Sequence, residues 1–195
     1  MDVDAIEALY ERHCRENHGI SMHLPTLREY ASRCDVAVEL GCRKGCSATA
    51  LILGARSLAV SYDITETPQA RDLQRMAGKR WSYRIEDTRT ADVPACDMLF
   101  VDSLHTYAQV DAELKAHAGK VRRWLLFHDT MTFGSVGADV ETGKHSWTPR
   151  PNESVPMEHM GIRPAIDALL IRDPAWRIID HKLYGHGLLI LERDR

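Results

Sequence analysis

Four acidic and histidine side chains in the middle of the chain have the chemistry for proton transfer. Asp102 and His105 follow one short apolar run, and His128 and Asp129 follow another. Imidazole titrates near neutral pH, and a neighbouring carboxylate orients the ring and stabilises its charged form. If both apolar runs are strands of one parallel sheet, their carboxyl ends share an edge, and these four side chains meet there.

A second group, residues 35 to 50, has the pattern of a ligand-binding turn. The apolar run Val36–Leu40 carries one acid, Glu39, and the chain then breaks at Gly41 and Gly45 before a run of helix-forming residues. This order predicts a buried strand, a tight turn and the start of a helix. Backbone N–H groups and the helix dipole face a ligand in such an arrangement.

The glycine spacing indicates which nucleoside would bind. A pyrophosphate-binding G-x-G-x-x-G pattern needs glycine where this chain has Arg43 and Cys46. The pattern present is E-x-G-x-x-x-G-x-S, from Glu39 to Ser47. A nucleoside without pyrophosphate needs less backbone clearance, and a positively charged amino-acid tail would favour Glu39. S-adenosylmethionine fits this description, and the alternative is a tight turn that binds nothing.

Two later acids strengthen the nucleoside hypothesis. Asp63 ends the apolar run Leu58–Asp63, roughly twenty residues beyond the glycine turn, where a carboxylate can accept both ribose hydroxyls. Asp87 follows the predicted strand Trp81–Ile85, where the adenine edge would lie. Acids also occur at such places as turn or helix-cap residues, which is the competing interpretation. We predict Glu39, Gly41, Gly45, Ser47, Asp63, Asp87 and Asp102 as cofactor-binding residues.

Alternating strand and helix patterns must position these groups. Apolar runs alternate with amphipathic segments, which predicts an α/β fold with a Rossmann-like, doubly wound sheet in a three-layer sandwich. The last two strands are joined by residues 184–187, a turn short enough only for an antiparallel hairpin. The alternation of strands and helices predicts parallel strands, so the sheet is predicted to be mostly parallel with an antiparallel hairpin at the end of the chain. Its predicted strands are residues 36–40, 58–63, 81–85, 98–101, 124–127, 176–179 and 188–191.

Two regions flank this alternating core. Residues 1–34 have the apolar spacing of two amphipathic helices, and Pro25 suits the first turn of the second. His23, just before that helix, is predicted to be a solvent-exposed loop residue, with ligand contact as the alternative. Residues 134–160 lack periodicity and are rich in Gly, Pro and Ser, which predicts a long lid loop.

Composition narrows the class of protein. A chain of 195 residues that is 44% apolar and has a net charge of -3 fits a single domain spanning residues 1–195. Nucleic acid is disfavoured as a partner, and the basic run Lys120–Arg123 is predicted to be a solvated loop. No apolar run is long enough to span a bilayer and no signal peptide is recognised, so we expect a cytoplasmic protein. The five cysteines lack a C-x-x-C pair and are expected to be reduced.

Several motifs make the sequence similar to a known family. They are VELGCRKGCSA, SYDI, DMLFVDSLHTYAQVDAEL, LLFHDT, GIRPAIDALLIRDPAWRI and HGLLIL. The sequence resembles class I S-adenosylmethionine-dependent methyltransferases, most closely the small branch with macrocin O-methyltransferase-like and cephalosporin hydroxylase-like proteins. The resemblance covers most of the chain from Leu24 onward, and its most specific part surrounds FVDSLHTY.

The resemblance implies a reaction and roles for the first four residues. Metal-dependent members of this family hold a divalent ion with an acid at the position of Asp102 and an acidic or amide pair after the fifth strand. Carried over by position, the metal ligands are Asp102, His128 and Asp129. Because His128 replaces an oxygen ligand, Mg²⁺ is less favoured than Mn²⁺ or Fe²⁺. Asp102, His105 and His128 are the implied catalytic residues.

His105 fits the D-x-x-H pattern of this family and is predicted to be the general base. The competing role is a helix-cap histidine that hydrogen-bonds Asp102. The expected substrate is a small molecule with a hydroxyl group. Metal-independent N- or O-methylation and a non-catalytic cofactor-binding protein remain the alternatives. The N-terminal helix and the hairpin edge are candidate homodimer surfaces.

Overall fold

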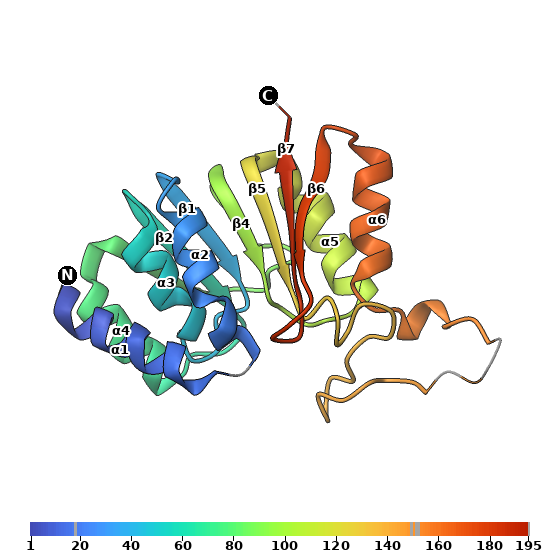
Figure 1. Cartoon of the computed structure of the whole chain (residues 1–195), viewed down its shortest axis with the longest axis horizontal. Coiled ribbons are helices and arrows are strands. Elements are labelled where there is room, and N and C mark those ends of the chain that lie inside the picture. The colour runs from blue at the N-terminus through green and yellow to red at the C-terminus, as the bar shows by residue number, and fades with distance from the viewer. Residues whose placement is uncertain (18, 149, 151–152, 195) are drawn as a thin grey trace.

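The computed structural model describes residues 1–17, 19–148, 150 and 153–194. One seven-stranded sheet crosses the molecule in the order β3-β2-β1-β4-β5-β7-β6 (Figure 1). Strands β1 to β5 pair in parallel, whereas β7 runs antiparallel to β5 and β6, which confirms the predicted sheet. The strands are β1 (Val36–Leu40), β2 (Leu58–Asp63), β3 (Trp81–Ile85), β4 (Cys96–Val101), β5 (Val121–His128), β6 (Trp176–Lys182) and β7 (Leu188–Arg193).

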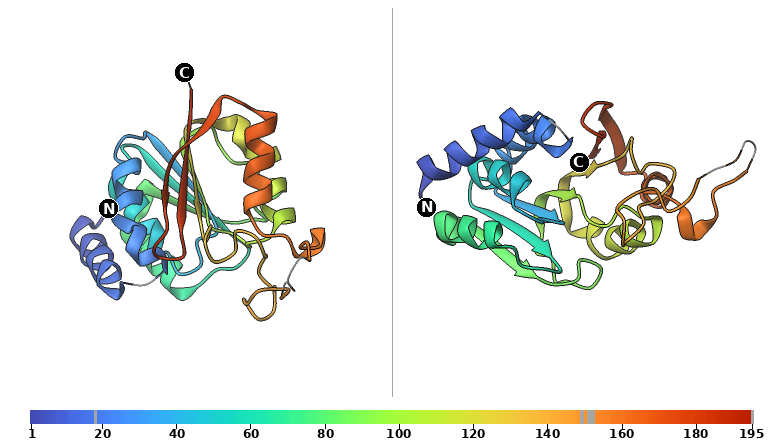
Figure 2. Two further views of the ribbon diagram at one scale, coloured as in Figure 1. Left: turned by 45° about the vertical axis from the view of Figure 1, so that its right-hand side comes forward. Right: turned by 90° about the horizontal axis from the view of Figure 1, so that it is seen from below.

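Helices cover both faces of the sheet (Figure 2), and each face has its own core. Neighbouring strand residues alternate between the two, so that Ala37 packs with α1 to α4 and Val38 with α5 and α6. Burial on both faces explains why these strands are almost continuously apolar. The helices are α1 (Val3–Glu16), η1 (Gly19–His23), α2 (Leu24–Ala31), α3 (Cys46–Gly54), α4 (Pro68–Ala77), η2 (Gly78–Arg80), α5 (Tyr107–His117), η3 (Ala118–Lys120), η4 (Met157–His159) and α6 (Arg163–Arg172).

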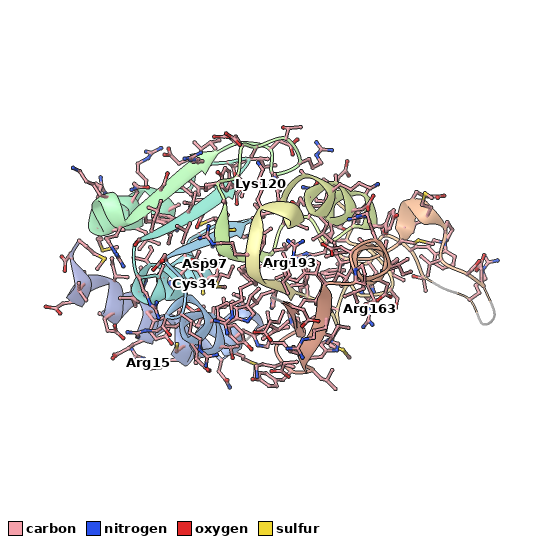
Figure 3. All side chains as sticks on the ribbon, turned by 90° about the horizontal axis from the view of Figure 1, so that it is seen from above. Arg15, Cys34, Asp97, Lys120, Arg163 and Arg193 are labelled. Atoms are coloured by element: carbon pink, nitrogen blue, oxygen red, sulfur yellow. The ribbon has the colours of Figure 1, made fainter. Side chains whose placement is uncertain are left out.

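The basic run at the start of β5 differs from its prediction. The predicted loop is wrong, because β5 begins at Val121 and includes both arginines. The Arg122 guanidinium pairs with Asp97 at 2.7 Å (Asp97 is labelled in Figure 3), and the Arg123 guanidinium lies 4.0 Å from the Trp124 ring centroid. Paired and stacked in this way, charged side chains are accommodated on a strand whose other residues are buried.

The carboxyl ends of the parallel strands lie at the lower edge of the sheet in Figure 1, from which the described residues of the segment 134–160 project. Within this segment the described residues form η4 and two isolated bridges, Val136 with Met160 and Ala138 with His145. Residues 149, 151 and 152 of the predicted lid lie outside the described part of the chain. No helix among the described residues is long and apolar enough to cross a membrane.

Candidate active site

The glycine turn is packed directly against the end of β4. Gly41 has a φ of +90°, and a Cβ at this position would lie 2.2 Å from the Asp102 carbonyl oxygen. The backbone N–H of Asp102 donates to the Leu40 carbonyl at 2.8 Å, and the N–H of Gly41 donates to the Tyr62 carbonyl at 2.9 Å. Only glycine fits both the conformation and the space. The turn therefore brings Asp102 next to the start of α3.

Glu39 lies beneath this turn and is fully buried. Ser47, in the first turn of α3, donates a hydrogen bond to its Oε1, while its Oε2 has no hydrogen-bond partner among the described residues. Burial raises the pKa of Glu39 to about 7, because its charged form is poorly solvated there. Gly45 has a φ of +82° at the N-cap of α3. Three of the predicted cofactor residues thus lie together, and Glu39 is the deepest of them.

Two further predicted cofactor acids, Asp63 and Asp87, are placed differently. Asp63 ends β2, and its Oδ2 accepts backbone hydrogen bonds from Cys42 at 3.1 Å and Arg43 at 2.6 Å, so it holds the glycine turn. Asp87 lies two residues beyond β3 on the surface. It pairs with Arg89 at 2.6 Å, and the hydrogen bonds from Arg89 lower the pKa of Asp87 to about 2. Their contacts to ribose and adenine remain predictions.

The four acidic and histidine residues after β4 and at the end of β5 form one cluster. One ligand atom from each of Asp102, His105, His128 and Asp129 lies within 4.8 Å of all the others. His105 Nε2 is 3.2 Å from both Asp102 Oδ1 and Asp129 Oδ2. His128 Nδ1 is 2.9 Å from Asp102 Oδ1 and 3.5 Å from Asp129 Oδ2. The sequence prediction that these four side chains meet is therefore correct.

A backbone carbonyl fixes the orientation of the His128 ring. Its Nε2 donates to the Gly185 carbonyl at 3.0 Å, so Nε2 carries a hydrogen and Nδ1 faces the two carboxylates. Burial alone would lower the pKa of His128, but the charges of Asp102 and Asp129 outweigh burial and raise it to about 9. Burial likewise opposes ionisation of Asp102, yet His128 and His105 hold the pKa of its carboxyl well below its usual range. Without a metal ion, the cluster contains a charged imidazole and an ionised carboxylate.

Asp129 has an unusual backbone and an unsatisfied oxygen. Its φ is +59°, a conformation that is uncommon for residues other than glycine and that often occurs at functional sites. Its Oδ1 lies 3.2 Å from His186 Nδ1, but the two groups are not aligned as a hydrogen bond. Oδ1 is therefore buried with no hydrogen-bond partner among the described residues. A cation or a proton donor on a substrate could satisfy it.

A cavity of about 900 Å³ connects the glycine turn with the acid–histidine cluster. Its walls come from the end of α1, from η1, from the turn before α3, and from the segments after β4 and β5. Neither Glu39 nor Asp63 is among the described residues that line it. The lining residues are His13, Glu16, Gly19, Ile20, Ser21, Gly41, Cys42, Arg43, Lys44, Cys46, Ser47, Asp102, Ser103, His105, His128, Asp129, Thr132, Phe133, Gly143 and His186.

Two more histidines lie near the cluster. The prediction for His23 is wrong, and no role was predicted for His186. The solvent-exposed loop predicted for His23 is wrong, because the residue is fully buried and its Nε2 lies 3.1 Å from the carbonyls of both Tyr184 and Gly185. Its partners lie on the β6–β7 turn, and local sequence carries no signal of that contact. His186, in the same turn, has a φ of +69° and lines the cavity. The only sequence feature that could have indicated this unusual conformation is the position of His186 between two glycines.

Comparisons with known proteins identify the fold. No family model matches the sequence, and no curated protein matches it either. Solved structures do match. A methyltransferase from Podospora anserina bound to S-adenosylhomocysteine has 18% identity and a TM-score of 0.58, over 98% of this chain and 88% of that one. An O-methyltransferase from Bacillus cereus in complex with S-adenosylhomocysteine has 13% identity and a TM-score of 0.64, over 98% and 91%.

A third similar structure contains a second bound small molecule beside S-adenosylhomocysteine. It is the 1,6-didemethyltoxoflavin-N1-methyltransferase of Burkholderia thailandensis, with 1,6-didemethyltoxoflavin and S-adenosylhomocysteine bound. Its identity is 12% and its TM-score 0.58, over 88% of this chain and 78% of that one. The chain therefore has the fold of class I S-adenosylmethionine-dependent methyltransferases. The glycine turn and the acid–histidine cluster lie at the carboxyl ends of its parallel strands, where ligands bind in open α/β sheets.

Proposed function

We propose that the protein transfers a methyl group from S-adenosylmethionine to a hydroxyl of a small molecule, assisted by a divalent metal ion. One observation carries the proposal: a cavity joins the glycine turn before α3 to four acidic and histidine side chains that could hold a metal ion, with one potential ligand atom of each within 4.8 Å of the others. A methyl donor and a metal-bound acceptor could therefore lie side by side.

The cofactor assignment is supported by the turn and by the similar structures. The turn needs glycine at position 41 and opens α3, a nine-residue helix whose first backbone N–H groups face a ligand. Structures of the same fold contain S-adenosylhomocysteine. The Burkholderia enzyme also contains bound 1,6-didemethyltoxoflavin, which supports a small molecule as the class of substrate.

The residues present fit a divalent cation. Asp102, His128 and Asp129 would hold it, and the hydrogen bond from His128 Nε2 to the Gly185 carbonyl is typical of histidines that bind a metal through the other nitrogen. The buried Asp129 Oδ1 has capacity for a further interaction. A mixed nitrogen and oxygen donor set suits Mn²⁺ or Fe²⁺ better than Mg²⁺. When bound, the ion lowers the pKa of a coordinated hydroxyl.

The chain's own residues position the reaction and accept the proton. Methyl transfer from a sulfonium is an in-line displacement, so the acceptor oxygen must lie opposite the departing sulfur. Asp102 links the glycine turn to the acid–histidine cluster. Its backbone contacts the turn, and its carboxylate contacts both His105 and His128. His105 Nε2, in contact with both carboxylates, is the proposed base for the acceptor proton.

Metal-independent transfer is the second candidate, and one observation favours it. The raised pKa of His128, about 9, means that a charged imidazole can balance the acids without any metal ion. A histidine would then act alone on an N or O acceptor. A non-catalytic cofactor-binding protein with the same fold is the third possibility.

Calorimetry with S-adenosylhomocysteine tests the cofactor assignment. Wild type should bind it, and Asp63→Ala should bind more weakly because Asp63 holds the turn that faces the ligand. Asp92→Ala is a matched control, since Asp92 has a 99% exposed side chain and pairs only with Lys120 among the described residues. Absence of binding by wild type would overturn the cofactor assignment.

Metal removal separates the two catalytic candidates. Activity should be lost after thorough EDTA treatment and return with Mn²⁺ or Fe²⁺, whereas unchanged turnover would support metal-independent transfer. His105→Ala should lower kcat by about 10²–10⁴-fold while leaving metal affinity nearly unchanged, as expected for a general base. A parallel fall in metal affinity would instead make His105 a ligand.

A further inference from the structure

We propose that Ser103 selects the adenine base of the cofactor: its hydroxyl, held as a hydrogen-bond acceptor by the buried carboxylate of Glu113, binds the exocyclic amino group of the base. This inference rests on the proposed binding of S-adenosylmethionine. It adds a specificity-determining residue, Ser103, and a positioning residue, Glu113, to that site. The sequence predictions gave neither residue a role.

Glu113 is a fully buried acid on α5 that accepts hydrogen bonds from three side chains. Its Oε1 accepts from Thr88 Oγ1 and, at 2.8 Å, from Gln109 Nε2. Its Oε2 accepts from Ser103 Oγ at 2.8 Å. Burial raises the pKa of Glu113, and the three hydrogen bonds oppose this rise because they favour the ionised form. An ionised carboxylate has no hydrogen to give, so each group in contact with it must donate.

The contact with Glu113 fixes the polarity of the Ser103 hydroxyl. A serine hydroxyl has one hydrogen and two lone pairs. The hydrogen of Ser103 points to Glu113 Oε2, which has no other hydrogen-bond partner among the described residues. Turning the hydrogen away would leave a buried charged oxygen unsatisfied, which is costly. Ser103 also lines the cavity, so its hydroxyl offers a ligand lone pairs and no hydrogen.

An acceptor of this kind fits a group that can only donate. S-adenosylmethionine has two such groups, the ammonium and the amino group of adenine, whereas its ribose hydroxyls can donate or accept. The ammonium belongs to the amino-acid part, which faces the N-terminus of α3 in the proposed site. The Ser103 hydroxyl points instead to α5, which packs on the opposite face of the sheet from α3. Through Glu113 it is tied to Thr88 in the segment after β3, where the adenine edge is predicted. The adenine amino group is therefore the donor that matches Ser103.

Two ligands that differ at one group of the base test the assignment. S-inosylhomocysteine has a carbonyl oxygen where S-adenosylhomocysteine has the amino group. Calorimetry at about pH 8, above the ordinary pKa of glutamate, would compare wild type with Ser103→Ala, Glu113→Gln and Asp111→Asn. Asp111 is the matched control, because it lies on the same helix, pairs with Lys115 at 2.6 Å and is absent from the described cavity wall.

The wild-type protein should prefer the amino group. It should bind S-adenosylhomocysteine about 10- to 100-fold more tightly than S-inosylhomocysteine, whose carbonyl oxygen would face the lone pairs of Ser103. Ser103→Ala should reduce this ratio by about tenfold, because it removes the acceptor. Asp111→Asn should keep the wild-type ratio.

Glu113→Gln should shift the preference in a way that damage to the cavity wall cannot. Its amide oxygen stays toward Thr88 and Gln109, because both side chains donate. Its amide nitrogen then takes the place of Oε2 and donates to Ser103 Oγ. The hydrogen of Ser103 is thereby released toward the cavity and can donate to a carbonyl oxygen. S-inosylhomocysteine should bind about tenfold more tightly than to wild type, while S-adenosylhomocysteine binds more weakly.

Three results would overturn the assignment. An unchanged ratio in Ser103→Ala would exclude a contact with the amino group. Equal losses for both ligands in Glu113→Gln would show that Glu113 does not set the polarity of Ser103. If Ser103→Ala weakened S-adenosylhomocysteine but not 5′-methylthioadenosine, which has the base without the amino-acid part, the bound group would be the ammonium. Absence of S-adenosylhomocysteine binding by wild type is a different failure, because it removes the proposed function itself.

Discussion

The protonation of His128 makes the stability of the metal-free protein depend on pH in a defined direction. The ordinary histidine pKa of 6.5 rises to about 9 in the folded chain. A folded-state pKa above the unfolded value stabilises the folded state fully below pH 6.5, and this contribution is lost as the pH rises through about 9. Stability should therefore fall across the alkaline side of neutrality.

The size of the effect follows from the shift. A rise from 6.5 to about 9 corresponds to about 3 kcal/mol at 1.36 kcal/mol per pKa unit. The side chain of His128 is only 5% exposed, so solvent screening reduces this value little. The lowered pKa of Asp102 reports the same ion pair and adds nothing to the sum. Burial lowers the pKa of three other histidines, His23, His117 and His181. Their effect on the free energy of unfolding therefore changes below pH 6.5, outside the range from pH 6.5 to 9 in which His128 acts.

Urea unfolding of EDTA-treated protein at several values between pH 6.5 and 9.5 measures this contribution. The free energy of unfolding of wild type should fall by about 3 kcal/mol more than that of His128→Gln, which has no ionisable group at this position. Parallel curves for the two proteins would refute the assignment of a charged imidazole. With saturating Mn²⁺ the trend should reverse, because a metal ion competes with the proton for Nδ1.

Two further predictions concern the backbone around the site. Gly41→Ala should lower the free energy of unfolding by more than about 3 kcal/mol, because its Cβ would lie 2.2 Å from the Asp102 carbonyl oxygen at a φ of +90°. Gly119→Ala is the control for the same urea experiment, because a Cβ at position 119 has no atom within 4 Å. If Gly41→Ala and Gly119→Ala were equally stable, a clash between residue 41 and the Asp102 carbonyl would be contradicted. His23→Leu should cost about 0.5–1.5 kcal/mol, the net contribution of one hydrogen bond, because the Gly185 carbonyl loses the His23 contact but still accepts a hydrogen bond from His128. A loss below about 0.5 kcal/mol, the size of an ordinary surface substitution, would show that His23 does not hold the hairpin turn.

Much of the sheet could be predicted because its signals are local. The bounds of β1, β2 and β3 agree with the predicted runs, since each strand is an apolar stretch that ends at a glycine or an acid. The hairpin of β6 and β7 followed from the length of its turn. The start of β5 could not be predicted, because charged residues by themselves disfavour a buried strand. In the structure, Arg122 pairs with Asp97 and Arg123 stacks on Trp124, and these contacts stabilise the two arginines on the strand.

The cluster was predictable, whereas its surroundings were not. Parallel strands end at a common edge, so residues that follow β4 and end β5 had to converge. The buried contact between His23 and the carbonyl of Gly185 joins residues 162 positions apart, and no periodicity encodes it. The same applies to the contribution of α1 to the cavity wall. Sequence reasoning therefore found the groups suited to chemistry but missed those that enclose and orient them.

Asp102 couples the two halves of the proposed site. Its backbone carbonyl is what excludes a side chain at Gly41, and its carboxylate is the shared partner of His105 and His128. A substitution at Asp102 would change the histidine charges without moving the glycine turn, because the turn contacts only its backbone. Cofactor binding by Asp102→Asn should consequently persist while proton transfer fails, and loss of both would show that the carboxylate itself contacts the cofactor.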